Sequence, residues 1–291
     1  MRLIIFLKKM KFEISKKSIS NLFSETHCDP PFSPKLWSGT FSKYEKTKII
    51  AVISTPKSGS TYVTNVISNH TNIPFKRLCY AYSSNEHDLY LPALMTAKTT
   101  GGVSQLHMRA SPHNIQLIKS FEIKGIIMVR NIFDALVSFS RDVKKKLNAD
   151  YLGSGIYGYS FIWLNQDLKN MSNEELINYC IDFYVPWYLN FIVSWSNHKK
   201  DSQFLFIRYE TLLKNKLNTF QKIMGHIGEN TKISDEILKK NYLQNEKTIS
   251  GTESAISSGY DNLSNKQIKK IKDKFNYFET KNIEEYLEYK K

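Results

Sequence analysis

Three short apolar runs, each followed by a pattern of helical length, restrict this chain to a narrow class of folds. The runs occupy residues 48–54, 124–129 and 203–208, and they have the apolar character of strands that are buried on both faces. Helical spacing of apolar residues follows them at 60–70, 133–146 and 216–228. Because buried strands that alternate with helices favour a covered parallel sheet, we predict an α/β fold with a central parallel sheet flanked by helices on both faces.

The rest of the chain adds shorter elements to this pattern. A short strand is predicted at 104–108 and further helices at 113–119, 174–198, 233–240 and 266–275. Residues 71–102 are mixed and contain a loop signal at 99–102, and 151–160 is a loop rich in Gly and Tyr. Residues 1–45 are polar and show little periodicity. No repeat and no linker between two cores is evident. We therefore expect an N-terminal lead-in segment at 1–45 and a single α/β domain at 46–291.

The junction after the first apolar run has the composition of an anion-binding loop. The run stops at Thr55, a helix-like pattern begins near Ser60, and Pro-Lys-Ser-Gly (56–59) stands between them. The N-terminus of a helix that follows a parallel strand presents unpaired N–H groups and a positive dipole end, and both favour anions. Gly59 permits a tight turn, and Lys57 adds a full charge. The junction is therefore interpreted as a phosphate cradle, with an ordinary strand–helix turn as the alternative.

The first loop also has a specific resemblance. The Walker pattern G-x-x-x-x-G-K-[S/T] is absent, because the lysine precedes the glycine and no glycine opens the loop. Instead, Pro-Lys-Ser-Gly-Ser-Thr-Tyr (56–62) resembles the 5′-phosphosulfate loop of the sulfotransferase family. The resemblance implies a P-loop-NTPase-like fold, 3′-phosphoadenosine 5′-phosphosulfate (PAPS) as donor co-substrate, and no metal. It assigns Lys57 to the bridging oxygen of the donor, and the donor-binding residues in this loop are Lys57, Ser58, Gly59, Ser60 and Thr61.

Two later segments agree with this resemblance. Residues 126–138 end a strand at Arg130 and place Ser138 eight residues on, similar to the family's motif for the 3′-phosphate of the donor. A planar, permanently charged guanidinium suits a phosphate. Tyr209 matches the family's strand-end tyrosine near the adenine, and Tyr62 could stack on the adenine. A half-buried strand end for Tyr209 and core packing for Tyr62 are the alternatives.

For the catalytic base, relatives use a histidine between the two phosphate motifs. His107 stands in that place, and a neutral histidine can accept a proton at cell pH. His113 and then His70 are the alternatives. Gln105 stands where relatives often have a second lysine, so that charge is either absent or supplied by Arg109.

The sequence departs from the family near its C-terminus. The Arg-Lys-Gly loop that closes on the 3′-phosphate in relatives is not evident. Residues 250–260 stand in about that place without the Arg-Lys pair. Either this closing loop is degenerate, or Lys247 and its neighbours replace it.

Composition and charge limit the classes of binding partner and the cellular compartment that we expect. The net charge of +14 favours anionic partners, but the lysines are scattered and lack the basic–aromatic interleaving of nucleic-acid binding, so we expect no nucleic acid. The three cysteines lie far apart without metal-ligand spacing. No run approaches the roughly 20 apolar residues that span a bilayer. We expect a cytoplasmic protein without a transmembrane segment, and nothing indicates its oligomeric state.

The function that these residues predict is transfer of a sulfuryl group from PAPS to a hydroxyl or amine by in-line displacement. The alternatives are a P-loop-type kinase, which would need a metal-binding carboxylate such as Asp134, and a non-catalytic nucleotide-binding protein of the same fold. The small-molecule acceptor should lie against 76–102 and 150–170. Aromatic residues cluster there and favour a phenol, alcohol, lipid or sugar ring, unless they only anchor loops: Tyr80, Tyr82, Tyr90, Tyr151, Tyr157, Tyr159, Phe161 and Trp163.

Overall fold

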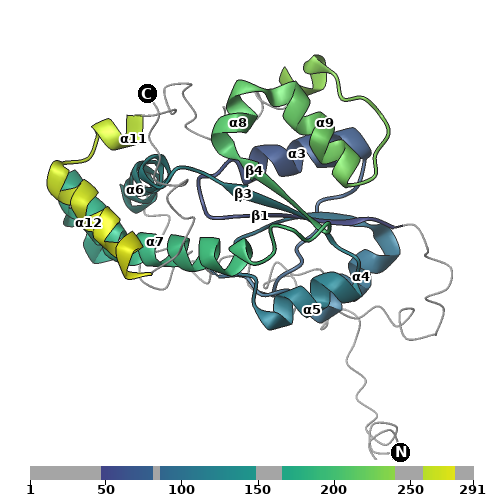
Figure 1. Cartoon of the computed structure of the whole chain (residues 1–291), viewed down its shortest axis with the longest axis horizontal. Coiled ribbons are helices and arrows are strands. Elements are labelled where there is room, and N and C mark those ends of the chain that lie inside the picture. Colours follow the sequence, from purple (N-terminus) through teal and green to yellow (C-terminus); the bar gives the residue numbers. More distant parts are fainter. Residues whose placement is uncertain (1–46, 81–85, 149–165, 240–257, 279–291) are drawn as a thin grey trace, which may run out of the picture.

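A computed structural model describes residues 47–80, 86–148, 166–239 and 258–278 of the chain (Figure 1). Within these residues, parallel strands form one sheet in the order β2-β1-β3-β4. The strands are β1 (Ile49–Ser54), β2 (Gly102–Leu106), β3 (Lys124–Val129) and β4 (Phe204–Arg208). The predicted α/β fold with a central parallel sheet is confirmed.

Helices cover both faces of this sheet, as Figure 1 shows. One face is covered by α3 (Ser60–Thr71) and α9 (Lys216–His226), and the short α8 (Tyr209–Lys214) lies beside them. The other layer contains α4 (Leu91–Thr100), α5 (Pro112–Ser120), α6 (Ile132–Asn148) and α7 (Asn173–Ser196). The remaining described elements are the 3-10 helix η4 (Gln166–Asn170), α11 (Ser258–Asp261) and α12 (Asn265–Tyr277).

The central strand β1 divides the apolar core in two. Ile49, Ala51 and Ile53 face the cluster under α4 to α7, whereas Ile50 and Val52 face the cluster under α3 and α9. All of these side chains are buried, so the strand is apolar at every position rather than at every second one. The continuous apolar run in the sequence therefore reflects a strand with helices on both sides.

Among the α-helices that the structure describes, α4, α8 and α11 were not predicted from the sequence. Residues 91–100 form α4, although the sequence indicated loop character through Thr99 to Gly102. Of the loop predicted at 99–102, only Gly101 lies between α4 and β2. It has φ +71° and donates its N–H to the carbonyl of Ala97 at the end of the helix. Pro92 in the first turn and a glycine after the last are the ordinary signals of a helix, and they were available in the sequence. The helix α8 begins directly after β4.

Candidate functional site

The carboxyl ends of the strands bring the predicted site residues to one edge of the sheet. Because all paired strands are parallel, their carboxyl ends lie on the same side. Residues 55–59 follow β1, His107 follows β2, Arg130 follows β3 and Tyr209 follows β4. Segments that lie far apart in the chain, from residue 55 to Tyr209, thus meet at one edge of the sheet.

The loop after β1 has a backbone that favours small residues. Gly59 precedes α3 with φ +83°, and Lys57 has φ +66°, which is uncommon for a residue with a side chain. A Cβ atom on Gly59 would lie 2.8 Å from two ring atoms of Tyr209. Glycine is therefore required here both for the turn and for the close approach of the Tyr209 ring.

Side chains from distant elements hold this loop in place. The Arg130 guanidinium donates to the carbonyl of Lys57 over 2.7 Å, and the Tyr184 hydroxyl on α7 donates to the carbonyl of Pro56 over 3.1 Å. Within the loop, the hydroxyl oxygens of Thr55 and Ser58 lie 3.1 Å apart. Burial raises the pKa of the Tyr184 hydroxyl, so it remains a donor across the physiological range. The loop conformation is thus fixed before any ligand is bound.

Arg130 is the buried cation of the site. The residue is 4% exposed, and its guanidinium carbon lies 4.4 Å from the centroid of the Tyr209 ring. Tyr188 donates its hydroxyl proton to the Arg130 carbonyl. A guanidinium that is stacked on an aromatic ring keeps its edge N–H groups in a defined plane, which suits recognition of a phosphate.

Lys57 has an acidic partner that sequence reasoning missed. Its Nζ lies 3.4 Å from Oδ1 of Asp142 on α6, and the other oxygen of Asp142 lies 2.9 Å from Nζ of Lys146. Burial alone would raise the pKa of the Asp142 carboxyl, but the charges and hydrogen bonds of Lys57 and Lys146 outweigh it and lower the pKa. Asp142 lies one helical turn beyond Ser138, so both are on one face of α6.

The hydroxyl and aromatic residues of the loop have different surroundings. Ser60 is buried at the start of α3, and Thr61 donates its hydroxyl proton to Oε1 of Gln105 on β2 over 3.0 Å. Tyr62 instead packs its ring edge-on against Phe220 of α9, at a centroid separation of 5.6 Å. Its hydroxyl donates to the carbonyl of Leu238 over 3.3 Å.

His107 has a defined ring orientation at the end of β2. Its Nδ1 lies 2.8 Å from the carbonyl oxygen of Ser54, which ends β1. Burial and the nearby His87 lower the pKa of His107 to about 3, against a smaller opposite effect of the Ser54 carbonyl. The imidazole is therefore neutral near pH 7. Since a carbonyl can only accept, Nδ1 bears the hydrogen and Nε2 is the basic nitrogen.

The alternative histidines lie elsewhere. Nε2 of His113 on α5 is 3.2 Å from the carbonyl of Leu89, and Nε2 of His70 near the end of α3 is 3.2 Å from the Thr231 hydroxyl. Arg109 is engaged by Glu86 in an exposed ion pair, with N–O distances of 2.7 and 2.9 Å. Sequence reasoning missed His87, whose ring stacks on that of His107 at a centroid separation of 5.4 Å.

Asp134, the carboxylate that a kinase would need for a metal, is hydrogen-bonded to another helix. Oδ1 of Asp134 accepts the backbone N–H of Gly259 over 2.8 Å, which ties α11 to the start of α6. Tyr260 packs edge-on against Phe133 at 5.1 Å. Among the residues that the structure describes, no group of three or more His, Cys, Asp or Glu side chains is placed to hold a metal ion.

The aromatic residues predicted to line the acceptor site are only partly described. Tyr80 is exposed, and its ring contacts Tyr90 edge-on at 5.4 Å. The remaining six aromatic residues of that prediction, together with Lys247, lie outside the described residues.

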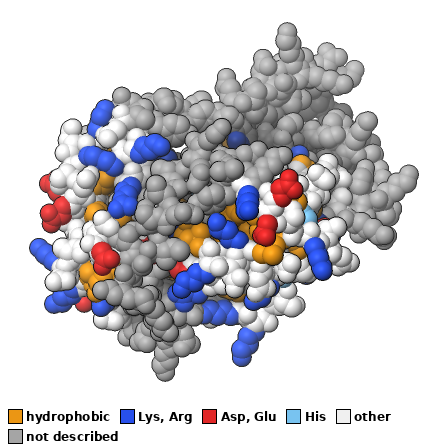
Figure 2. Space-filling model, turned by 90° about the horizontal axis from the view of Figure 1, so that it is seen from above, with side chains coloured by type: hydrophobic (Ala, Val, Ile, Leu, Met, Phe, Trp, Pro, Cys, Tyr) orange, Lys and Arg blue, Asp and Glu red, His pale blue; other side chains and the backbone are white. Residues whose placement is uncertain are grey.

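On the face shown in Figure 2, the described basic residues do not gather in one patch. Figure 2 shows Lys and Arg side chains distributed over the described part of one face, with acidic and hydrophobic side chains between them. In the part of the chain that the structure describes, no helix is both long and apolar enough to cross a membrane.

Comparisons with known proteins identify a family and a fold. A family model described as "Sulfotransferase domain" matches residues 47–291. The fold is similar to that of mouse sulfotransferase SULT7A1 in complex with PAP, at a TM-score of 0.60 and 16% identity over 88% of this chain and 95% of that one.

It is also similar to retinol dehydratase in complex with androsterone and the inactive cofactor PAP, at a TM-score of 0.50 and 13% identity over 80% of this chain and 81% of that one. No curated protein matches this chain. At these identities the structural likeness concerns the fold alone.

Proposed function

Because this chain belongs to the sulfotransferase family, we propose that it transfers a sulfuryl group from PAPS to a hydroxyl or amine of a small-molecule acceptor. The observation on which the proposal rests is the convergence of the fixed loop at 55–59, the buried Arg130 and the neutral His107 at one sheet edge. A loop, a cation and a base in one place are what an in-line displacement of an anionic group requires.

The donor would be bound by two anion-binding regions, one for each phosphate position. The start of α3, with Ser58, Gly59, Ser60 and Thr61, offers backbone N–H groups and hydroxyls to the 5′-phosphate. Arg130 and Ser138 offer the 3′-phosphate a guanidinium and a hydroxyl from the end of β3 and from α6. The Tyr209 ring, which lies between Gly59 and Arg130, is assigned to the adenine side. Tyr62 points to α9, so we assign its contribution to packing of α3.

The chemical step divides between two side chains. PAPS supplies the sulfuryl group, and transfer breaks the bond between sulfur and the 5′-phosphate oxygen. Lys57 stabilises the charge that develops on that oxygen, once it exchanges Asp142 for the phosphate. Nε2 of His107 takes the proton of the attacking hydroxyl or amine, because Nδ1 donates to Ser54. The lowered pKa keeps this ring neutral at cell pH and leaves the Nε2 lone pair free, while it also makes the ring a weaker base than a free imidazole.

The acceptor is proposed only as a class. The retinol dehydratase complexes contain androsterone and retinol, which are apolar molecules with a hydroxyl group. Exposed Tyr80 and its neighbour Tyr90 offer aromatic surface of the kind that such an acceptor would contact. An apolar alcohol or phenol is therefore the first class to test.

The donor site is tested by calorimetric titration with 3′-phosphoadenosine 5′-phosphate (PAP), the spent donor, and with AMP, which lacks the 3′-phosphate. We expect micromolar binding of PAP, much weaker binding of AMP, and loss of PAP binding in Lys57→Ala and Arg130→Ala. Arg130→Lys is the matched control that keeps the charge without the planar guanidinium, and it should bind PAP weakly. Equal binding of PAP and AMP would contradict the donor assignment.

The base is tested by turnover. Release of PAP from PAPS is measured with a panel of 2-naphthol, benzyl alcohol and benzylamine, and with water alone. His107→Ala should lower kcat by about two to four orders of magnitude, the usual contribution of a positioned base, while PAP still binds. Turnover that survives in His107→Ala would remove His107 from the mechanism.

A further inference from the structure

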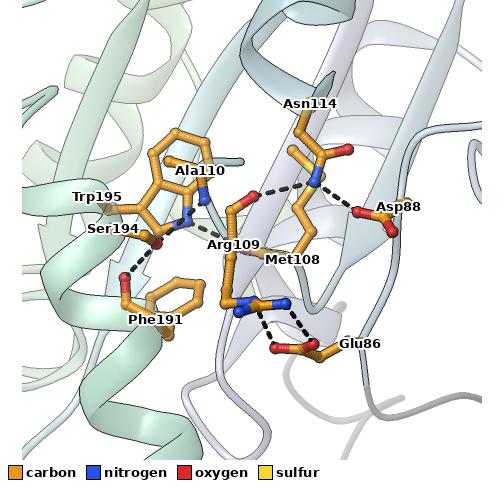
Figure 3. A network of polar contacts seen from close by, with 9 residues as sticks. All are labelled: Glu86, Asp88, Met108, Arg109, Ala110, Asn114, Phe191, Ser194 and Trp195. Carbon is orange, nitrogen blue, oxygen red and sulfur yellow. Dashed lines mark hydrogen bonds and ion pairs between the residues drawn. The ribbon is translucent and has the colours of Figure 1, made fainter. Parts of the chain in front are cut away.

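The segment 107–110, which contains His107, is hydrogen-bonded to α7. Trp195 donates its ring N–H to the carbonyl of Met108 over 2.9 Å, and the Ser194 hydroxyl oxygen accepts the N–H of Ala110 over 3.0 Å (Figure 3). The Trp195 side chain is buried, so water does not compete for its bond. Residues 108–110 are thus anchored to a long helix as soon as they leave β2.

On its other side this segment is joined to residues 86–89. Figure 3 shows the Arg109 guanidinium forked onto the Glu86 carboxylate, and the Asn114 amide reaching both Asp88 and the Arg109 carbonyl. Asn114 is fully buried, and its side-chain oxygen also accepts the N–H of Leu89 over 2.9 Å. Three bonds therefore converge on one amide, which makes the position of 86–89 relative to 107–114 precise.

His87 lies in the middle of this junction and contacts His107 in three ways. The His87 N–H donates to the His107 carbonyl over 2.9 Å, and Nδ1 of His87 accepts the His107 N–H, also over 2.9 Å. The two rings stack with an interplanar angle of 26°, and the edge of Trp187 closes a further side of the His107 ring. His87 is 3% exposed. A buried histidine that accepts a backbone N–H through Nδ1 must have its own hydrogen on Nε2 when neutral.

We propose that His87 is a positioning residue for His107, holding its backbone and one ring face so that Nδ1 reaches Ser54 and Nε2 is presented to the acceptor. The inference rests on the proposed role of His107 as the base. It assigns a function to a histidine that does not itself touch the reacting atoms. The physical reason is that a base contributes fully only when its ring is held in one orientation.

Two substitutions at His87 distinguish the effect of its hydrogen-bond acceptor, Nδ1, from the effect of its ring volume. In His87→Asn, the amide oxygen stands in the place of Nδ1 and can still accept the His107 N–H. His87→Leu keeps apolar volume against the His107 ring but leaves that N–H without its acceptor. Loss of one buried hydrogen bond corresponds to about a tenfold effect or more. We expect kcat to fall about tenfold in His87→Leu and less than about threefold in His87→Asn, with PAP affinity and acceptor KM nearly unchanged in both.

A second measurement, of the His107 tautomer, needs no acceptor substrate. Two-bond proton–nitrogen NMR spectra of histidine-labelled protein report which ring nitrogen bears the hydrogen, and His107→Ala assigns the signal. Wild type and His87→Asn should show His107 with hydrogen on Nδ1 alone, and His87→Leu should show a mixture. His226→Leu is the matched control, because it loses a 3.1 Å bond to the carbonyl of Gly125 at the opposite end of β3. Its kcat should equal that of wild type.

The outcomes distinguish this inference from the proposed function. Unchanged kcat and an unchanged Nδ1–H tautomer in His87→Leu would overturn the role of His87, even if His107→Ala is inactive. Turnover in His107→Ala would overturn the base assignment, while the tautomer still tests the positioning. If His87→Leu does not fold, His87→Gln replaces it, because its amide oxygen is displaced by one methylene. A kcat equal to that of His87→Asn would then overturn the proposal.

Discussion

At the scale of single residues, the pairing of Lys57 with Asp142 is the least expected feature of the site. A carboxylate lies 3.4 Å from the lysine that is proposed to meet an anionic donor. Lys146 shares the same carboxylate. The arrangement holds Lys57 in a fixed place before the donor arrives, but the negative charge of Asp142 opposes donor binding.

We predict that Asp142→Asn binds PAP more tightly than wild type. Removal of a half-buried negative charge should lower the Kd for PAP by a factor of about three to ten at low salt, and by less at high salt. Calorimetry at two salt concentrations measures this. Asp182→Asn is the matched control, because Asp182 also pairs with two lysines, Lys270 at 2.6 Å and Lys274 at 3.1 Å, but on α7 and α12. An equal gain in both variants would mean that only the net charge matters.

At the scale of elements, the docking of α11 on the start of α6 joins the C-terminal part of the described chain to the helix that follows Arg130. A Cβ atom on Gly259 would lie 2.5 Å from the backbone of Phe133 and Asp134, so only glycine allows this approach. The Asp134 carboxylate, which accepts the Gly259 N–H, is also in the first turn of α6, where a negative charge is favoured. Asp134 therefore has a structural role between two helices.

We predict that Gly259→Ala displaces α11. The overlap should cost about 1–3 kcal/mol in the free energy of unfolding, measured by urea denaturation. Backbone amides at the start of α6 should exchange faster with solvent. Gly225→Ala is the matched control, because a Cβ atom there meets nothing within 4 Å, and it should stabilise α9 by up to about 1 kcal/mol. Unchanged stability in Gly259→Ala would show that α11 can shift without cost.

At the scale of the whole molecule, two partly buried, neutral histidines link stability to pH. Burial and the neighbouring His87 lower the pKa of His107 to about 3, and burial also lowers the pKa of His226. Both groups have pKa values near 6.5 in the unfolded chain. Below pH 6.5 the unfolded chain therefore binds more protons than the folded protein, so their contribution to stability is present above pH 6.5 and is lost as pH falls.

We predict that the free energy of unfolding falls by about 1.4 kcal/mol per pH unit for His107 between roughly pH 6 and pH 4. Urea denaturation at pH 7, 6 and 5 measures the slope. His107→Asn should flatten the curve by about one proton, because asparagine does not titrate. Parallel curves for wild type and His107→Asn would contradict a His107 that stays neutral in the folded protein.

Local sequence determined the parts of this protein that depend on neighbouring residues. The apolar runs specified buried strands, because only residues apolar at successive positions suit a strand with helices on both sides, as β1 has. The run of small residues ending in Gly59 specified the turn into α3, and the order of strand and loop placed Arg130 at a strand end. The strand predicted at 104–108 included His107, whereas β2 spans Gly102–Leu106 and ends before it. The helix α4 was missed although Pro92 and Gly101 mark its ends.

The tertiary structure alone decided which of these residues meet. His87 reaches His107 across 20 positions, Lys57 reaches Asp142 across 85, and Gly259 reaches Asp134 across 125. No local pattern encodes such pairs, because they depend on how helices and loops pack over the sheet rather than on the periodicity of any segment. The same packing turned Tyr62 toward Phe220 and gave Arg130 the Tyr209 ring. Sequence by itself thus determined the sheet and the edge at which the candidate site lies, and packing determined the partners that orient each side chain there.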